Sequence, residues 1–119
     1  MQSESLELWK KNLHEAIRNI ADLNSQRIIW LGRSLDYESS FDEYMMSLFD
    51  DFDIERFISK ESWPNMKLPE SLRLEIEQLI MEFNSYRVKA TDKEILEDPE
   101  WHKITNQARE VIQNWDKNR

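Results

Sequence analysis

The amino-acid sequence predicts an all-α fold, a compact bundle of about four longer helices with one or two short helices. Glycine and proline, which interrupt helices, are rare, with one Gly and three Pro among 119 residues. Apolar residues recur at spacings of three and four along most of the chain, which is the period of one helix face. The run that could form a strand, residues 28–31, has no second convincing strand to pair with. Because 39% of the residues are hydrophobic, residues 1–119 are expected to bury one core as a single domain.

Two helices are expected before residue 36. The first spans about residues 4–23, and Ser3 or Ser5 is its expected N-cap. Its apolar face consists of Leu6, Trp9, Leu13, Ala16, Ile17, Ile20 and Leu23. The segment "SQRIIWLGRSL", residues 25–35, is interpreted as a short buried helix, because four apolar residues follow one another within it.

A third helix is expected over residues 41–52. Ser40 and Glu43 have the spacing of a capping box, in which each side chain satisfies a backbone N–H of the first turn. The buried side of this helix is expected to carry Phe41, Tyr44, Met45, Leu48, Phe49 and Phe52. Asp53 is expected to cap a short helix that begins at "IERFIS".

In the second half of the chain, the sequence predicts one loop and three further helices. Residues 61–68, "ESWPNMKL", are interpreted as a loop, because Pro64 and Pro69 disfavour helical geometry in the residues before them. A helix is then expected from Pro69 to about Val88. Its apolar face consists of Leu72, Ile76, Leu79, Ile80, Phe83 and Tyr86.

Each of the last two helices is preceded by residues that favour the start of a helix. Thr91 and Glu94 offer a capping box for the short helix "DKEILE", and Asp98 followed by Pro99 predicts the start of the final helix. The apolar face of that helix consists of Trp101, Ile104, Ala108, Val111, Ile112 and Trp115. No internal repeat or low-complexity linker divides the chain.

The negative charge of the chain is concentrated in one segment. The formal net charge is -8, and residues 36–63 alone hold nine acidic and two basic residues. A field of this kind attracts basic partners and repels phosphate backbones, so nucleic acid is not expected as a direct ligand. The N-terminus lacks the continuous apolar run of a signal peptide or membrane span. Together with the absence of Cys, this favours a cytoplasmic protein without disulfides or membrane contact.

The sequence gives little support for catalysis. Nucleophilic catalysis needs a base beside the nucleophile, and the chain has no Cys and two His, each inside an expected helix. We interpret both as structural residues, His14 at the edge of the first apolar face with a boundary or capping role and His102 near a helix start. No Glu-x-x-His pair, glycine-rich phosphate loop or zinc protease motif is present. We therefore expect no enzyme activity and no metal or cofactor.

One segment partly resembles a calcium-binding EF-hand loop. Asp51, Asp53 and Glu55 match its first, third and fifth positions. However, Arg56 stands where the loop needs Gly, and Ser62 replaces the bidentate Glu. Because both positions are essential to the loop, a specific calcium site is not expected.

The segment "FDEYMMSLFDDFDIE" mixes acidic residues with aromatic residues and Met, and eight acidic residues lie between residues 36 and 55 with no base among them. One interpretation is an ordinary amphipathic helix with a solvated acidic face. The other is a protein interface, in which aromatic side chains supply contact area and carboxylates pair with Arg and Lys of a partner. We favour the interface, because Asp50, Asp51 and Asp53 lie toward the helix end, where the helix dipole disfavours acids. The predicted partner-binding residues are Asp36, Tyr37, Glu38, Asp42, Glu43, Tyr44, Asp50, Asp51, Asp53, Glu55 and Trp63. For Trp63, which precedes Pro64 in the expected loop, we favour a lid over the bundle to a direct contact with a partner.

With its acid and aromatic stretch "LDYESSFDEYMMSLFDDFD", the chain resembles the small acidic immunity proteins that bacteria make against their own nuclease toxins, as in contact-dependent growth inhibition. The small size, helical character and lack of Cys are also similar. The resemblance implies a cytoplasmic, non-catalytic inhibitor that covers the active site, or a neighbouring exosite, of a cationic nuclease.

Two other functions remain open at the level of sequence. A regulatory adaptor would use the same acidic helix to bind a basic partner protein. A nucleic-acid mimic would spread carboxylates over much of its surface, whereas outside residues 36–63 the basic residues nearly balance the acidic ones. The charge distribution therefore argues against mimicry and leaves the adaptor as the alternative.

Overall fold

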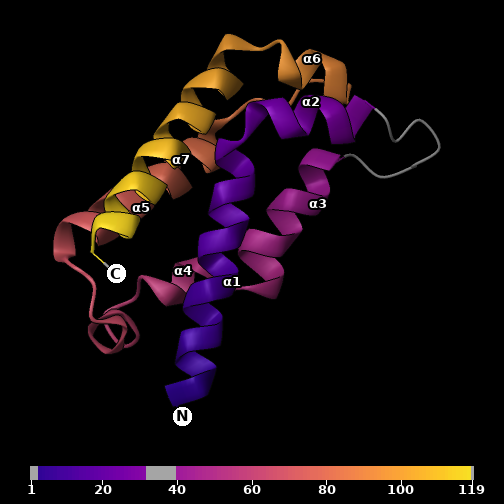
Figure 1. The fold of residues 1–119 in the computed structure, drawn as a ribbon. Helices are drawn as coiled ribbons and strands as arrows, with labels where there is room; N and C mark the ends of the chain where they lie inside the picture. Colours follow the sequence, from indigo (N-terminus) through magenta and orange to yellow (C-terminus); the bar gives the residue numbers. More distant parts are fainter. Residues whose placement is uncertain (1–2, 32–39, 119) are drawn as a thin grey trace.

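The computed structural model describes residues 3–31 and 40–118, and every regular element in these ranges is helical (Figure 1). The all-α prediction is therefore confirmed. The elements are α1 (Ser3–Ala21), α2 (Leu23–Leu31), α3 (Ser40–Met46), the π-helix η1 (Ser47–Asp51), α4 (Ile54–Phe57), the 3-10 helix η2 (Trp63–Met66), α5 (Glu70–Ser85), α6 (Asp92–Leu96) and α7 (Pro99–Lys117).

Three long helices form the body of the molecule. Helix α7 packs along both α1 and α5, while α2 and α6 pack together at one end of the bundle (Figure 1). The apolar faces predicted for α1, α5 and α7 meet in the core, where Leu13, Ile17, Leu79, Trp101 and Val111 are fully buried. The chain from α3 through η1 packs against α1 and leaves one side toward solvent. This placement determines which acidic side chains a partner can reach.

Three of the predicted helix starts are confirmed by their side-chain hydrogen bonds. Asp53 Oδ1 accepts from the backbone N–H of Arg56 at 3.4 Å, and Thr91 Oγ1 accepts from that of Glu94 at 3.1 Å. Asp98 Oδ1 accepts from the backbone N–H of Glu100 at 3.0 Å. In each case a side-chain oxygen satisfies an N–H that has no partner inside its helix.

The predicted starts of α1 and α3 are less well defined. Ser5 lies inside α1 and is not its N-cap, while the side chain of Ser3 falls outside the described part of the structure. The structure starts α3 at Ser40, whose side chain is also outside the description, so its capping box with Glu43 stays a prediction.

The junction between α1 and α2 differs from the sequence prediction. The first helix ends at Ala21 because Asp22 starts a new one, accepting hydrogen bonds from the backbone N–H of Ser25 at 3.0 Å and from its hydroxyl at 2.8 Å. These two hydrogen bonds also hold the pKa of the Asp22 carboxyl below its ordinary value. The interruption turns α2 across the end of the bundle, as Figure 1 shows.

The expectation that the second helix is buried throughout is wrong. Trp30 is buried, but Ile28, Ile29 and Leu31 have exposed fractions of 77%, 45% and 52%. The reason is helical geometry: four consecutive residues point around the whole helix, and α2 rests on the bundle with one side only. Its second buried residue is the polar Gln26.

The segment predicted as a loop contains the short helix η2. Its Trp63 ring packs edge-on against Phe57 at a centroid separation of 5.8 Å, and Met66 is fully buried. Pro64 lies in the first turn of this helix, and the helix ends at Met66 because Lys67 adopts a left-handed conformation with φ 58°. The aromatic and sulfur side chains nevertheless anchor this segment in the core.

Candidate functional site

The predicted partner-binding residues do not form one surface. Asp36, Tyr37 and Glu38 lie outside the described residues. The structure distributes the others over an outward face of α3 and η1, the side toward α1, the start of α4 and the core. Among the described residues, Asp42 and Asp50 therefore line a different hollow from Glu43 and Tyr44.

Asp42 and Asp50 lie on one outward face together with three apolar side chains. We call this surface, made of Asp42, Met45, Met46, Phe49 and Asp50, the methionine face; its five residues line one hollow that opens to solvent. Met46 is 50% exposed, Met45 and Phe49 are half-buried, and both carboxylates are exposed. No basic side chain within the described ranges forms an ion pair with Asp42 or Asp50. The face thus presents free negative charge beside accessible apolar surface.

The π-helix η1 helps to align the two carboxylates. Its closing hydrogen bond runs from the backbone N–H of Phe52 to the carbonyl of Ser47 at 2.9 Å, a separation of five residues. In a regular α-helix, Asp50 would be rotated by roughly 80° from Asp42 about the axis. The wider turn rotates the chain less per residue, which brings Asp50 back toward the line of Asp42. Short π segments inside helices occur frequently at functional sites.

Glu43 and Tyr44 lie on a different side of α3. They line a separate hollow with residues of α1, among them Lys11 and Glu15. The Tyr44 ring packs edge-on against Trp30 with centroids 5.3 Å apart, and both Glu43 and Tyr44 are half-buried. Because they face α1, they do not extend the methionine face.

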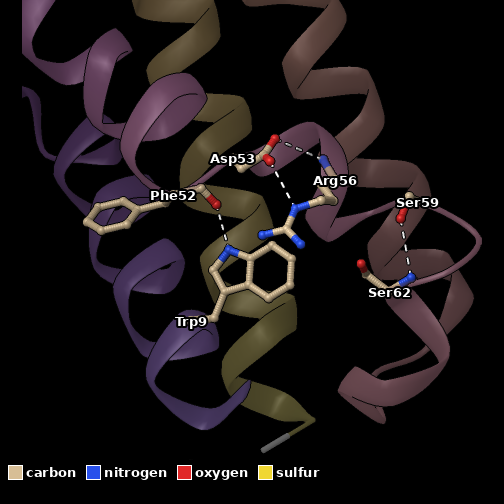
Figure 2. A network of polar contacts seen from close by, with 6 residues as sticks. All are labelled: Trp9, Phe52, Asp53, Arg56, Ser59 and Ser62. Atoms are coloured by element: carbon tan, nitrogen blue, oxygen red, sulfur yellow. Dashed lines mark hydrogen bonds and ion pairs between the residues drawn. The ribbon is translucent and has the colours of Figure 1, made fainter. Parts of the chain in front are cut away.

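Asp53 belongs to a local network that Figure 2 shows from close by. Its Oδ2 accepts a hydrogen bond from Arg56 Nε at 3.0 Å, and the Arg56 guanidinium lies 4.6 Å from the ring centroid of Trp9. Trp9 Nε1 in turn donates to the carbonyl of Phe52. Asp53 also adopts a left-handed conformation with φ 47°, which Asp tolerates better than most residues. The carboxylate of Asp53 is therefore engaged inside the molecule, unlike those of Asp42 and Asp50.

The remaining predicted residues separate into exposed and buried ones. Asp51 and Glu55 are exposed and, within the described ranges, have no ion-pair partner. Trp63 is only 6% exposed and lies in the core. Its ring offers little contact area to a partner, so the alternative of a structural role fits its position better.

The sequence prediction overlooked the exposed methionine. The apolar spacing predicts that Met45 and Phe49 lie on the buried side of the helix, and it predicts no contact for Met46. In the structure Met45 is half-buried and Met46 points toward solvent. The available signal was that Met46 stands outside the apolar spacing of this helix, because an exposed Met is frequent at adaptable binding surfaces.

The two histidines hold helices together. His14 Nε2 donates to Asp116 Oδ1 at 2.8 Å, which joins α1 to the end of α7. His102 Nε2 donates to the carbonyl of Leu96 at 2.6 Å, which joins α7 to α6. Neither contact includes a nucleophile. Within residues 3–31 and 40–118, no group of three or more His, Cys, Asp or Glu side chains could hold a metal ion.

The strongest perturbation of ionisation lies at the pair Tyr86 and Asp98. Tyr86 Oη donates to Asp98 Oδ2 at 2.8 Å. Burial and this hydrogen bond raise the pKa of Tyr86 far above its ordinary value, so its hydroxyl remains a donor at neutral pH. Burial works to raise the pKa of Asp98 as well, but hydrogen bonds from Tyr86 and the backbone of Glu100 outweigh it and hold that pKa below its ordinary value. We interpret the pair as structural, because Asp98 caps α7.

Replacing Tyr86 with Phe should lower the free energy of unfolding by about 1 kcal/mol near neutral pH, because the Asp98 carboxylate loses a buried donor. A carboxyl whose folded pKa is depressed contributes stability above its unfolded pKa and loses it as the pH falls through the folded pKa. The difference in the free energy of unfolding between the wild type and the variant should therefore become smaller at acidic pH. Urea unfolding at about pH 7 and about pH 3 checks this; a difference that does not change with pH would mean that the Tyr86 hydroxyl does not act through the charge of Asp98.

Comparisons with family models, curated proteins and solved structures give no match to this chain. In the described part of the chain, no helix is long and apolar enough to cross a membrane. The functional proposal consequently depends on the geometry and charge of the chain itself.

Proposed function

We propose that the chain is a non-catalytic immunity protein, which inhibits a cationic nuclease toxin by binding it on the methionine face. One observation carries the proposal: Asp42 and Asp50, two exposed carboxylates that form no ion pair with any residue of the ranges 3–31 and 40–118, border a hollow whose Met46 is 50% exposed. Charged groups and apolar contact area are thus available on the same surface. Asp51 and Glu55 add negative charge nearby in the sequence.

The chemistry of this surface favours a basic protein as the partner. Arg and Lys of a partner would pair with the two carboxylates, and apolar side chains of the partner would cover Met45, Met46 and Phe49. Among the described residues, no ion pair of Asp42 or Asp50 has to be broken before Arg or Lys of a partner can bind. The net charge of -8 accelerates the encounter with a cationic protein.

A nuclease is the basic partner that fits the remaining properties best. Its substrate groove has to be cationic to hold phosphates, and a bound acidic protein competes for the same positive charges. The expectation from the resemblance to bacterial immunity proteins points to the same class. Inhibition needs no catalytic residue in the chain, which agrees with the structural roles of His14 and His102.

The alternative is a regulatory adaptor that binds a basic segment of another protein. The observation that favours it is that all five residues of the methionine face come from one continuous stretch of the chain, α3 and η1. The two functions differ in what binding does. An immunity protein abolishes the nuclease activity of its partner, whereas an adaptor binds a partner without such activity.

The test compares two double variants that remove the same amount of charge. In Asp42→Asn/Asp50→Asn the acids of the methionine face are neutralised; in the control, Glu97→Gln/Glu110→Gln, two exposed acids elsewhere are neutralised. Each protein is used to capture partners from the source cell, and the captured protein is identified and assayed for nuclease activity with and without the chain.

We expect the Asp42→Asn/Asp50→Asn variant to bind the captured protein at least about tenfold more weakly at low salt, mainly through faster dissociation. The control should change the affinity less than about threefold, since distant charges are screened. A higher salt concentration should reduce the difference in affinity between the two double variants. Equal effects of the two variants would contradict the proposed site, and a captured partner without nuclease activity would favour the adaptor.

A further inference from the structure

We propose that the methionine face receives one basic amphipathic helix of the partner, laid along α3 and η1. This inference rests on the proposed function and specifies the kind of segment that occupies the site. It follows from the spacing of the two carboxylates, the shape of the apolar strip between them and the hydrogen bonding that this surface can offer.

The spacing of the carboxylates matches two turns of a second helix. Asp42 and Asp50 are eight residues apart, which corresponds to roughly 12 Å along the axis of a regular α-helix, and the wider turn of η1 shortens this span. On a partner helix, basic residues at positions i and i+7 lie on one face at about the same separation. Such a helix can place one Lys or Arg at each end of the methionine face at the same time.

The apolar strip between the acids accepts side chains that lie between the two bases. Residues at i+3 and i+4 of the partner helix fall on the same face as the bases. They would contact Met46, which is 50% exposed, and the half-buried Met45 and Phe49. Because Met has flexible χ angles and a polarizable sulfur, the strip can adapt to Leu, Met or Phe in the partner.

A helix fits this surface better than an extended strand. The five residues of the methionine face lie on helical segments, whose backbone N–H and C=O groups are largely engaged in helix hydrogen bonds. An extended segment would therefore bury its own backbone groups against Met and Phe without partners, which costs free energy. A helix satisfies its backbone internally and presents side chains alone.

Two synthetic peptides of about 18 residues test the inference on the full chain. The matched peptide carries Arg at i and i+7 with Leu at i+3 and i+4 on an Ala-rich background. In the shifted peptide the second Arg is moved to i+9, which places it on the opposite side of the helix at identical composition. Binding is measured by fluorescence anisotropy of labelled peptide, and helix formation by circular dichroism.

We expect the matched peptide to bind at least about tenfold more tightly than the shifted one and to gain helix when bound. Met46→Ser should weaken its binding about tenfold, because apolar contact area is lost. The control Met81→Ser, at a residue of α5 that is 56% exposed, should leave binding unchanged. Equal binding of both peptides, a bound peptide without helix, or equal effects of the two Met variants would overturn the inference.

The failure of this inference can be told apart from failure of the proposed function. If the captured partner depends on Asp42 and Asp50 but the peptides do not discriminate, the partner uses another kind of segment and the proposed function stands. If the captured partner binds the Asp42→Asn/Asp50→Asn variant as tightly as wild type, the proposed function fails whatever the peptides do.

Discussion

Replacing Gln26 with Leu should lower the free energy of unfolding by about 3 kcal/mol, although the two side chains are similar in size. Gln26 is completely buried, and its amide nitrogen donates to the carbonyls of Asn19 and Ile20 at 2.8 Å each. Its Oε1 accepts from Trp101 Nε1 at 3.0 Å. Leu would leave the indole N–H without a partner in the core and the last turn of α1 without its donor, and each unsatisfied buried group costs about 1 to 3 kcal/mol.

The matched control is Gln113→Leu, an exposed glutamine on α7, which should change the free energy of unfolding by less than about 0.5 kcal/mol. Urea unfolding of both variants at neutral pH provides the comparison. A loss of similar size in the two variants would mean that the hydrogen bonds of Gln26 do not stabilise the junction of α1 and α2.

Replacing Asp53 with Ala should cost about 2 kcal/mol, whereas Asp53→Asn should cost less than about 0.5 kcal/mol. Ala removes the oxygen that caps α4, and it is strained at the positive φ of this position. Asn keeps a cap oxygen and tolerates the left-handed conformation. The ion pair with Arg56 is exposed and contributes little, so its loss in the Asn variant should be small.

The same pair of variants separates folding from binding at Asp53. Because its carboxylate is engaged by Arg56, we expect Asp53→Asn to change partner affinity less than Asp50→Asn does. Thermal and urea unfolding measure the stability of each variant, and titration with the captured partner measures affinity. If Asp53→Asn weakened binding more strongly than Asp50→Asn, the assignment of Asp53 to an internal role would be wrong.

Local signals in the sequence were sufficient to predict most helices. The faces of α1, α5 and α7 follow from apolar spacing, and the starts at Asp53, Thr91 and Asp98 follow from side chains that satisfy nearby N–H groups. These interactions span a few residues, so their pattern is visible in the sequence. The break at Asp22 is also local, but the continuous apolar pattern across it concealed the cap.

Features that depend on distant contacts could not be predicted in the same way. Gln26 accepts a hydrogen bond from Trp101, 75 residues further along the chain, and Trp63 belongs to a core that includes residues of α1, α5 and α7. The exposed position of Ile28 follows from which side of α2 rests on the bundle. None of these contacts has a periodic signature.

The acidic segment combines one property that the sequence shows directly with one that only the folded structure shows. Its concentration of charge is a property of the sequence, but the division of its carboxylates among different surfaces depends on the packing of α3 and η1. The π turn places Asp50 near the line of Asp42, while Glu43 faces α1 and Asp53 pairs with Arg56. Counting charges along the sequence therefore locates the acidic segment. Only the fold shows that Asp42 and Asp50 share one face.

The most direct test of the central claim is oxidation of methionine by hydrogen peroxide, followed by mass spectrometry of the free chain and of its complex with the captured partner. Met46 and Met81 are exposed to a similar degree, 50% and 56%, and both should be oxidised readily in the free chain. A partner on the methionine face would slow the oxidation of Met46 strongly and leave Met81 unchanged. Oxidation of Met46 at the same rate in the complex as in the free chain would contradict the proposed interface.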